Sequence, residues 1–331
     1  MTRLTRIFLL LLLLAFSPAV RGQEPSLLRR LDEKVPIKTT GGILFWGDIL
    51  YHSGWHIQKN AAIDTYRLLD ANSIQRAYGT FDECKNRLDE ILTEKNIPPM
   101  TGTAVIVLHG FGANSLLTRN LGDWLREQKT HDYVFCMSYP STMQSILDHA
   151  NMLDQVVKNL PPTVKQIDFV GHSLGCLVIR RYLSGPLDDN WKVPENKMEY
   201  RQKFSPDARI GRFVMLGPPN HGAVIATKLI GNDPLRQFLT GKSGAELGTD
   251  WNETEKTLGI PCCPFMIVAG GRGNHLGYSL LIPGDNDGVV STEGTKLEGA
   301  EKWMLFNVGH TEMLFTPSIN NAVEKFLLKG E

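Results

Sequence analysis

A serine stands between two glycines in the pentapeptide Gly171-His172-Ser173-Leu174-Gly175. The preceding run, Gln166–Val170, is typical of a strand, and the following run, Leu174–Leu183, is typical of a helix. A sharp turn between a strand and a helix can hold a nucleophilic serine above a sheet, and the glycines leave room for the neighbouring strand and helix. A Gly/Ser-rich loop has the same spacing, so the residues that could assist Ser173 decide between the two interpretations.

A serine hydroxyl needs a base within hydrogen-bond reach, and the base needs a carboxylate to orient it. His310 directly follows the strand-like run Lys302–Val308, and is our candidate base. Asp287 lies on a sharp Asp/Gly loop, before the apolar anchor Val289-Val290, and is the preferred carboxylate; Asp285 on the same loop is the alternative. The order Ser, Asp, His is the one that accompanies a strand, a sharp turn and a helix. A solvated Asp-Gly turn and a surface histidine are the alternatives.

Three other histidines could compete for the role of base. His172 adjoins the serine, so its side chain should diverge from that of Ser173, whereas His109 and His221 precede glycines on other loops. We expect these histidines to shape their loops by hydrogen bonding.

The oxyanion of an acyl-transfer intermediate needs backbone donors held in place before the reaction. The N–H of Leu174, at the start of the predicted helix, is the expected first donor. The second should come from the loop His109-Gly110-Phe111-Gly112, where the N–H of Phe111 is our choice. An ordinary glycine turn between a strand and a helix would have a similar sequence.

Six β-like runs alternate with amphipathic helical segments, which predicts a doubly wound α/β sheet. The runs are Ala104–Leu108, Tyr133–Ser138, Gln166–Val170, Arg212–Leu216, Phe265–Ala269 and Lys302–Val308. Several are apolar almost throughout, as in strands that are covered on both faces. Helical stripes fall at Leu117–Leu125, Ile146–Val157 and Ile319–Leu327, and Ser141 with Gln144 predicts a capping box before the second.

Two segments differ from this alternation. Residues 36–98 are expected to supply antiparallel strands at an edge of the sheet, within residues 42–59, and then a capped helix over Thr80–Leu92. Residues 223–259 carry apolar residues at helical spacing among glycines, and are interpreted as a lid over the site. An ordinary crossover helix on the sheet is the alternative.

The N-terminus predicts a cleaved secretory signal. Arg3 and Arg6 precede an unbroken apolar stretch that is too short to span a bilayer, which takes roughly 20 residues. Cleavage is expected after Gly22, or alternatively after Ala19, which leaves residues 23–331 as one domain. An uncleaved membrane anchor is the competing interpretation.

Composition excludes several classes of protein. With 35 basic and 35 acidic residues, the chain has no charge excess that would favour nucleic acid or disorder. Five cysteines are an odd number and show no zinc-like spacing, so we expect neither an essential disulfide nor a metal site.

Together, the serine pentapeptide, the His109–Gly112 loop, the Asp287-Gly288 loop and Gly309-His310 resemble the α/β-hydrolase superfamily, and within it the lipase and esterase branch. The segment Leu216–Gly222 also resembles a lipase loop. The resemblance covers residues 100–330 and implies a mostly parallel sheet of about eight strands, a Ser173-His310-Asp287 triad and acyl transfer to water without a cofactor or metal.

The expected function is therefore that of an exported serine hydrolase that cleaves carboxylic esters, including lipids, through an acyl-enzyme. Acyltransferase, thioesterase or amidase activity on the same triad remains an alternative, as does a catalytically silent binding protein. Transient contact with a lipid interface, the acyl chain length and the oligomeric state stay open.

Overall fold

The computed structural model describes residue 39 and residues 45–223 and 234–330, with side chains omitted for 234–240. The predicted signal at residues 1–22 lies outside these ranges, and so does the first part of the predicted lid, residues 224–233. Within the described ranges, no helix is both long enough and apolar enough to cross a membrane.

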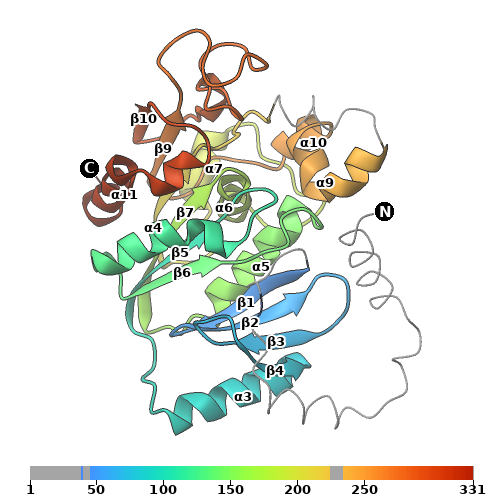
Figure 1. Ribbon diagram of the computed structural model, residues 1–331, viewed down its shortest axis with the longest axis vertical. Helices are drawn as coiled ribbons and strands as arrows, with labels where there is room; N and C mark the ends of the chain where they lie inside the picture. Colours follow the sequence, from blue (N-terminus) through green and yellow to red (C-terminus); the bar gives the residue numbers. More distant parts are fainter. Residues whose placement is uncertain (1–38, 40–44, 224–233, 331) are drawn as a thin grey trace, which may run out of the picture.

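The six predicted strands form one parallel sheet in the order β10-β9-β8-β7-β5-β6 (Figure 1). Their bounds are β5 Gly102–Leu108, β6 Tyr133–Met137, β7 Val164–His172, β8 Ile210–Leu216, β9 Phe265–Gly270 and β10 Lys302–Phe306. The prediction of about eight strands is not matched, because the described sheet has six.

Helices cover both faces of this sheet, as the alternation predicted. The helices on one face are α4 (Ser115–Glu127) and α11 (Pro317–Lys329), and on the other α5 (Ile146–Asn159) and α6 (Leu174–Ser184). Successive residues of β5 divide between the two faces. Val105 and Val107 belong to the α4/α11 core, whereas Ala104, Ile106 and Leu108 belong to the α5/α6 core. Side chains alternate across a strand, so a continuous apolar run is what a sheet covered on both faces requires.

The N-terminal strands build a sheet of their own. Its antiparallel order is β1-β2-β3-β4, and the bounds are β1 Trp46–His52, β2 Trp55–Asn60, β3 Tyr66–Leu69 and β4 Gln75–Gly79. The expectation that this region extends the main sheet is therefore wrong. The two sheets meet where the buried Asp48 receives the backbone N–H of Ser138 at 2.6 Å and donates its own N–H to the Ser138 carbonyl at 2.9 Å.

Helix α3 (Phe81–Glu94) follows this small sheet and begins as predicted. Thr80 and Glu83 form a reciprocal capping box at its N-terminus, and Cys84, Leu88 and Ile91 are buried. Helix α5 differs: its capping box is made by Ser145 and Asp148 rather than by Ser141 and Gln144. The two pairs have the same spacing, but the helix begins one turn later than the pattern suggested.

The remaining helical elements are α7 (Lys197–Lys203), α9 (Pro234–Leu247), α10 (Trp251–Glu255) and the short 3-10 segments η2 (Glu293–Thr295) and η3 (Glu312–Phe315). Helix α9 is interrupted at Gly241, where φ is 57°. A Cβ there would come within 1.7 Å of the Thr142 carbonyl oxygen, so α9 lies close to the loop before α5 at Gly241. The role of residues 223–259 as a lid stays a prediction.

Candidate active site

Ser173 lies at the sharp turn between β7 and α6. Its φ and ψ are 55° and −122°, outside the regions that side chains other than glycine usually occupy. Backbone strain of this kind persists only where the surrounding structure holds it, and it is concentrated at functional sites. The turn leaves Ser173 at the carboxyl end of a central strand and at the first turn of a helix.

The flanking glycines are required by space. A Cβ on Gly171 would lie 2.7 Å from the Cα of Cys176, and one on Gly175 would lie 2.6 Å from the carbonyl oxygen of His109. Both are collisions with backbone, which cannot rotate away as a side chain could. The glycines thus have the role that the sequence indicated.

His310 and Asp287 form a buried pair at the same end of the sheet. The Nδ1 of His310 lies 2.6 Å from the Oδ2 of Asp287, with side-chain exposures of 9% and 0%. The other carboxylate oxygen accepts the backbone N–H groups of Val289 at 2.9 Å and Val290 at 2.7 Å. With Nδ1 donating to the carboxylate, Nε2 is the nitrogen with a free lone pair.

The Nε2 of His310 is buried and has no hydrogen-bond partner among the described residues. A buried polar atom without a partner is costly, and such atoms are often found where a substrate completes the site. This nitrogen is therefore able to accept a proton from a neighbouring group.

Two contacts bring the serine and the histidine together. The backbone N–H of Ser173 donates to the carbonyl of Leu216 at 2.9 Å. The next residue, Gly217, has a φ of 56°, and a Cβ on it would lie 3.1 Å from the His310 ring and 3.3 Å from Asp287 Oδ2. The chain at the end of β8 thus contacts Ser173 through Leu216 and the His310–Asp287 pair through Gly217.

His172 supports the position of His310 from behind. One ring nitrogen, Nε2, lies 3.0 Å from the His310 carbonyl oxygen, and the two ring centroids are 4.9 Å apart. Burial, together with a smaller effect of the neighbouring His310, lowers the pKa of His172 to about 3. A neutral His172 can donate Nε2–H to that carbonyl. Its side chain therefore binds the backbone of His310 and not the side chain of Ser173.

Asp285, the alternative carboxylate, has a different function in the loop. Its side chain accepts the backbone N–H groups of Arg272 and Gly273, each at 2.8 Å. These hydrogen bonds hold the chain in place where it leaves β9. Of the two aspartates that the sequence offered, the fold brings Asp287 to His310.

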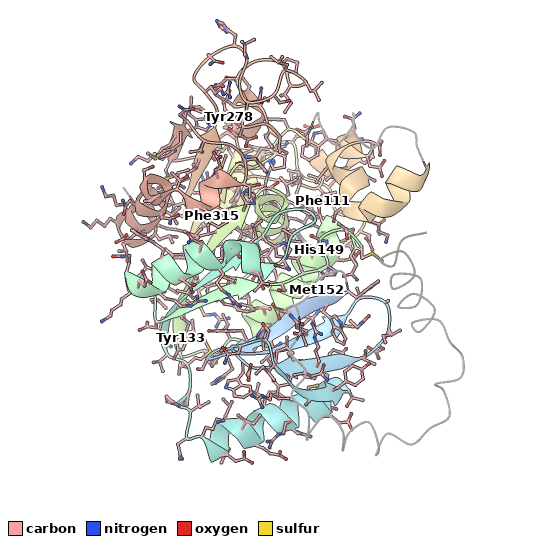
Figure 2. The ribbon with its side chains drawn as sticks, in the orientation of Figure 1. Phe111, Tyr133, His149, Met152, Tyr278 and Phe315 are labelled. Carbon is pink, nitrogen blue, oxygen red and sulfur yellow. The ribbon has the colours of Figure 1, made fainter. Side chains whose placement is uncertain are left out.

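The loop after β5 lies against the serine. A Cβ on Gly110 would be 3.0 Å from the Cβ of Ser173, and Gly112 adopts a φ of 67°. Between them, Phe111 is half-buried, and Figure 2 shows it in this loop. Across the serine, Leu174 is the first residue of α6, so its N–H has no acceptor within the helix. The N–H of Leu174 thus belongs to the residue after Ser173, and the N–H of Phe111 to the residue after Gly110.

The structure adds residues that the motifs did not reveal. The N–H of Gly112 donates to Ser141 Oγ at 3.1 Å, and the Tyr139 hydroxyl donates to the His109 carbonyl at 2.5 Å. The rings of His109 and Tyr139 stack at 4.2 Å, and burial lowers the pKa of His109 to about 4. A neutral His109 therefore shapes the loop, as the sequence suggested. Nothing local in the sequence marks Tyr139 or Ser141, since their partners lie about 30 residues away.

The arrangement does not include a metal centre within the residues that the structure covers, where no three potential ligands cluster. His221 is exposed and lies 3.5 Å from Glu255. It takes no part in the pair formed by His310 and Asp287.

The chain has the α/β-hydrolase fold. Among solved structures, the chain is similar to the lipase BlEst2 of Bacillus licheniformis in its propeptide form, with 17% identity and a TM-score of 0.52. This alignment covers 70% of the present chain and 51% of the lipase chain, so the match spans about half of that protein.

Two further solved structures align with TM-scores below 0.5. The mature form of the same lipase aligns at 16% identity over 70% of this chain and 93% of its own, with a TM-score of 0.47. A metagenomic carboxyl esterase aligns at 15% identity over 64% and 65%, with a TM-score of 0.44. No protein-family model matches the sequence, and no curated protein matches it.

Proposed function

We propose that this chain is an exported serine hydrolase that cleaves carboxylic esters through an acyl-enzyme. The observation that carries the proposal is the buried Nε2 of His310, which is oriented by Asp287 and has no partner among the described residues. The chain at the end of β8 contacts both this pair and the strained Ser173. The α/β-hydrolase fold, and a lipase of that fold as a neighbour, support the same reaction class.

The first half-reaction forms the acyl-enzyme. Ser173 Oγ attacks the ester carbonyl while His310 Nε2 takes its proton, and the Asp287 carboxylate stabilises the resulting imidazolium. The N–H groups of Phe111 and Leu174 hold the oxyanion, and loss of one such donor typically costs about 10²–10³ in kcat. Collapse of the intermediate breaks the bond to the alkoxide, which leaves with the proton from His310.

The second half-reaction returns the enzyme to its starting state. His310 Nε2 removes a proton from water, the hydroxide attacks the acyl-enzyme carbonyl, and the same donors hold the new oxyanion. The acid then leaves as Ser173 Oγ recovers its proton from His310. The protein needs only to hold these groups in place, which is why the closely packed turns around Ser173 matter.

A fluorophosphonate probe and a panel of esters test the proposal directly. Wild-type protein should be labelled at Ser173 and should release free acid from short- or long-chain esters. Ser173→Ala should lose labelling and at least about 10⁴ of kcat/KM, with unchanged thermal unfolding. A folded Ser173→Ala variant that keeps full activity would refute the assignment, as would wild-type protein that neither reacts with the probe nor cleaves any ester.

The acceptor and the cellular location need their own measurements. Adding an alcohol, thiol or amine to the assay distinguishes water from other acceptors, since an acyltransferase would give transfer product in place of free acid. Export is supported by the basic and apolar residues 1–22. N-terminal sequencing of the exported protein should find Gln23 as the first residue, or Val20 for the alternative cleavage site.

A further inference from the structure

The loop His109–Gly112, here called the oxyanion loop, carries the Phe111 N–H that we propose as a donor. Among the described residues, this N–H makes no backbone hydrogen bond. Its direction depends on the peptide group that it shares with the Gly110 carbonyl. The atoms of a trans peptide lie in one plane, and the C=O and N–H point in opposite directions. A contact that holds the Gly110 carbonyl therefore also sets the direction of the Phe111 N–H.

The His109 imidazole holds that carbonyl. Its Nδ1 lies 2.8 Å from the Gly110 carbonyl oxygen, which also accepts the N–H of Ala113 at 3.4 Å. A carbonyl oxygen can only accept, so Nδ1 carries the proton and Nε2 is left as an acceptor. The backbone N–H of Tyr139 lies 3.4 Å from this Nε2. The imidazole thus connects Tyr139 to the Gly110 carbonyl.

Tyr139 contacts His109 in two further ways. The Tyr139 hydroxyl donates to the His109 carbonyl at 2.5 Å, and the two rings stack with centroids 4.2 Å apart and planes 11° apart. Tyr139 is 1% exposed and His109 is fully buried, so water does not compete for these contacts. One tyrosine thus fixes the backbone, the ring and the tautomer of His109.

Tyr139 is held in turn by α5 and α9. The ring centroid of His149, on α5, lies 4.7 Å from that of Tyr139, and His149 Nε2 lies 3.1 Å from the Ser243 hydroxyl on α9. Ser243 donates its own proton to the Gln144 carbonyl at 2.7 Å, so it accepts from His149. His149 and Ser243 are both fully buried, and Figure 2 labels His149 and Phe111. Tyr139 is therefore packed between the oxyanion loop and these two helices.

The segment that carries Tyr139 also holds the other end of the oxyanion loop. Ser141, two residues further along, accepts the Gly112 N–H at 3.1 Å. Its own N–H donates to the Tyr139 carbonyl at 2.8 Å, which joins the two attachments. Phe111 thus lies between two contacts that come from the same turn after β6.

We propose that Tyr139 is a positioning residue, which acts through His109 to direct the Phe111 N–H toward the oxyanion. Tyr139 does not touch the substrate. Oxyanion donors work because they are in place before charge develops, so a loosened loop would bind an ester normally and stabilise its tetrahedral intermediate less. The effect on catalysis rests on the proposed function, but the effect of Tyr139 on the position of Phe111 does not.

Removal of one hydroxyl group tests this role. Tyr139→Phe should lower kcat for a soluble ester by about 10- to 100-fold and leave KM within about threefold, because a displaced donor costs less than a missing one. Affinity for a trifluoromethyl ketone, which forms a tetrahedral adduct, should fall by the same factor as kcat/KM. Exhaustive fluorophosphonate labelling counts the folded sites, so a variant that is merely less stable would show a normal kcat per site.

Tyr182→Phe is the matched control for this change. Tyr182 is 1% exposed on α6, and its buried hydroxyl has no partner among the described residues. Loss of an unpartnered hydroxyl removes no hydrogen bond, so kcat and KM should both stay at the wild-type values.

Two variants of His109 test the connection to the Gly110 carbonyl. His109→Asn places an amide N–H near the position of Nδ1, whereas His109→Leu provides no donor. The asparagine variant should keep a kcat at least about tenfold above that of the leucine variant. Equal kcat values in the two variants would overturn the path through His109.

Hydrogen exchange of the Phe111 amide, followed by NMR, tests the positioning without turnover. Exchange should be faster by about tenfold or more in Tyr139→Phe, and unchanged in Tyr182→Phe. Wild-type protein without ester hydrolysis would refute the proposed function, while faster exchange in Tyr139→Phe would still support the hold on Phe111. Unchanged exchange in Tyr139→Phe overturns the positioning role in either case, and so does an unchanged kcat per site in an active enzyme.

Discussion

Two of the histidine–carboxylate pairs in the described part of the chain have both side chains buried, and they differ in what else contacts the imidazole. His310 Nδ1 and Asp287 are 2.6 Å apart beyond the ends of β10 and β9. His131 Nε2 and Asp168 are 2.8 Å apart, with His131 just before β6 and Asp168 within β7. Both carboxylates have no exposed side-chain surface.

Both imidazole nitrogens of His131, and the carboxylate of Asp168, have hydrogen-bond partners. The second nitrogen of His131 lies 3.1 Å from the Thr130 hydroxyl. Asp168 also accepts the Arg212 N–H at 2.6 Å and the side chain of Gln166 at 2.9 Å. In the other pair, Nε2 of His310 has no partner in the described ranges, and a strained serine lies nearby. A buried histidine–carboxylate pair thus has a structural role when the second imidazole nitrogen is hydrogen-bonded. It is a candidate base when that nitrogen has no partner.

The largest expected effect separates the two histidines. His310→Gln should lower kcat/KM for esters by at least about 10⁴-fold, since the base is lost while the fold remains. His131→Gln should instead lower the free energy of unfolding by about 1–3 kcal/mol, because the buried carboxylate of Asp168 loses the imidazole as a hydrogen-bond partner. Steady-state kinetics and thermal unfolding of the two variants measure both quantities. Equal loss of activity per folded molecule would remove the distinction.

The carboxylates give the next comparison. Asp287→Asn should cost about 10⁴ in kcat, because an amide favours the wrong imidazole tautomer. Asp285→Asn should leave kcat within a few-fold, since Asp285 holds the N–H groups of Arg272 and Gly273. The pH dependence of kcat for each variant serves as the readout. A larger loss for Asp285→Asn would make Asp285 the partner of His310 during turnover.

The turn that holds Ser173 should be intolerant of a single methyl group. Gly175→Ala places a Cβ 2.6 Å from the His109 carbonyl oxygen, so we expect a loss of about 1–3 kcal/mol in stability and displacement of the oxyanion loop. Gly273→Ala is the control for the loss of a glycine without a collision, because no atom lies within 4 Å of its Cβ. Its φ of 70° is positive, unlike that of Gly175, so any loss of stability there comes from backbone strain alone. Chemical denaturation and ester kinetics should show lost activity in the first variant alone.

The smallest expected effect concerns Glu246 on α9, which receives the Ile146 N–H at 2.7 Å. Burial raises the pKa of Glu246 from 4.5 to about 7. The folded state therefore holds this proton more tightly than the unfolded state, and its contribution to stability falls as pH rises from 4.5 to about 7. Glu246→Gln should remove this decline while an amide oxygen still accepts the N–H. Unfolding across that pH range measures it, and identical pH profiles would contradict the assignment.

Much of the framework followed from local pattern. The six strands, the stripes of α4, α5 and α11, and the Thr80 cap of α3 each depend on residues close in sequence, and each was predicted within a few residues. The cap of α5 was misplaced from Ser145 to Ser141, because two serines with acceptable partners lie one turn apart. In the structure, Ser141 Oγ instead accepts the N–H of Gly112.

The sequence identified the types of residue that could react and their order along the chain, since the glycines, the serine and the loop residues at strand ends are visible locally. It favoured Asp287 and kept Asp285 as the alternative, but it did not assign the N-terminal strands to a separate sheet or show the contacts of Tyr139 and Gly217. Those outcomes depend on contacts between segments far apart in the chain. Such contacts form only when the helices pack on both faces of the parallel sheet and bring the loops at the strand ends together.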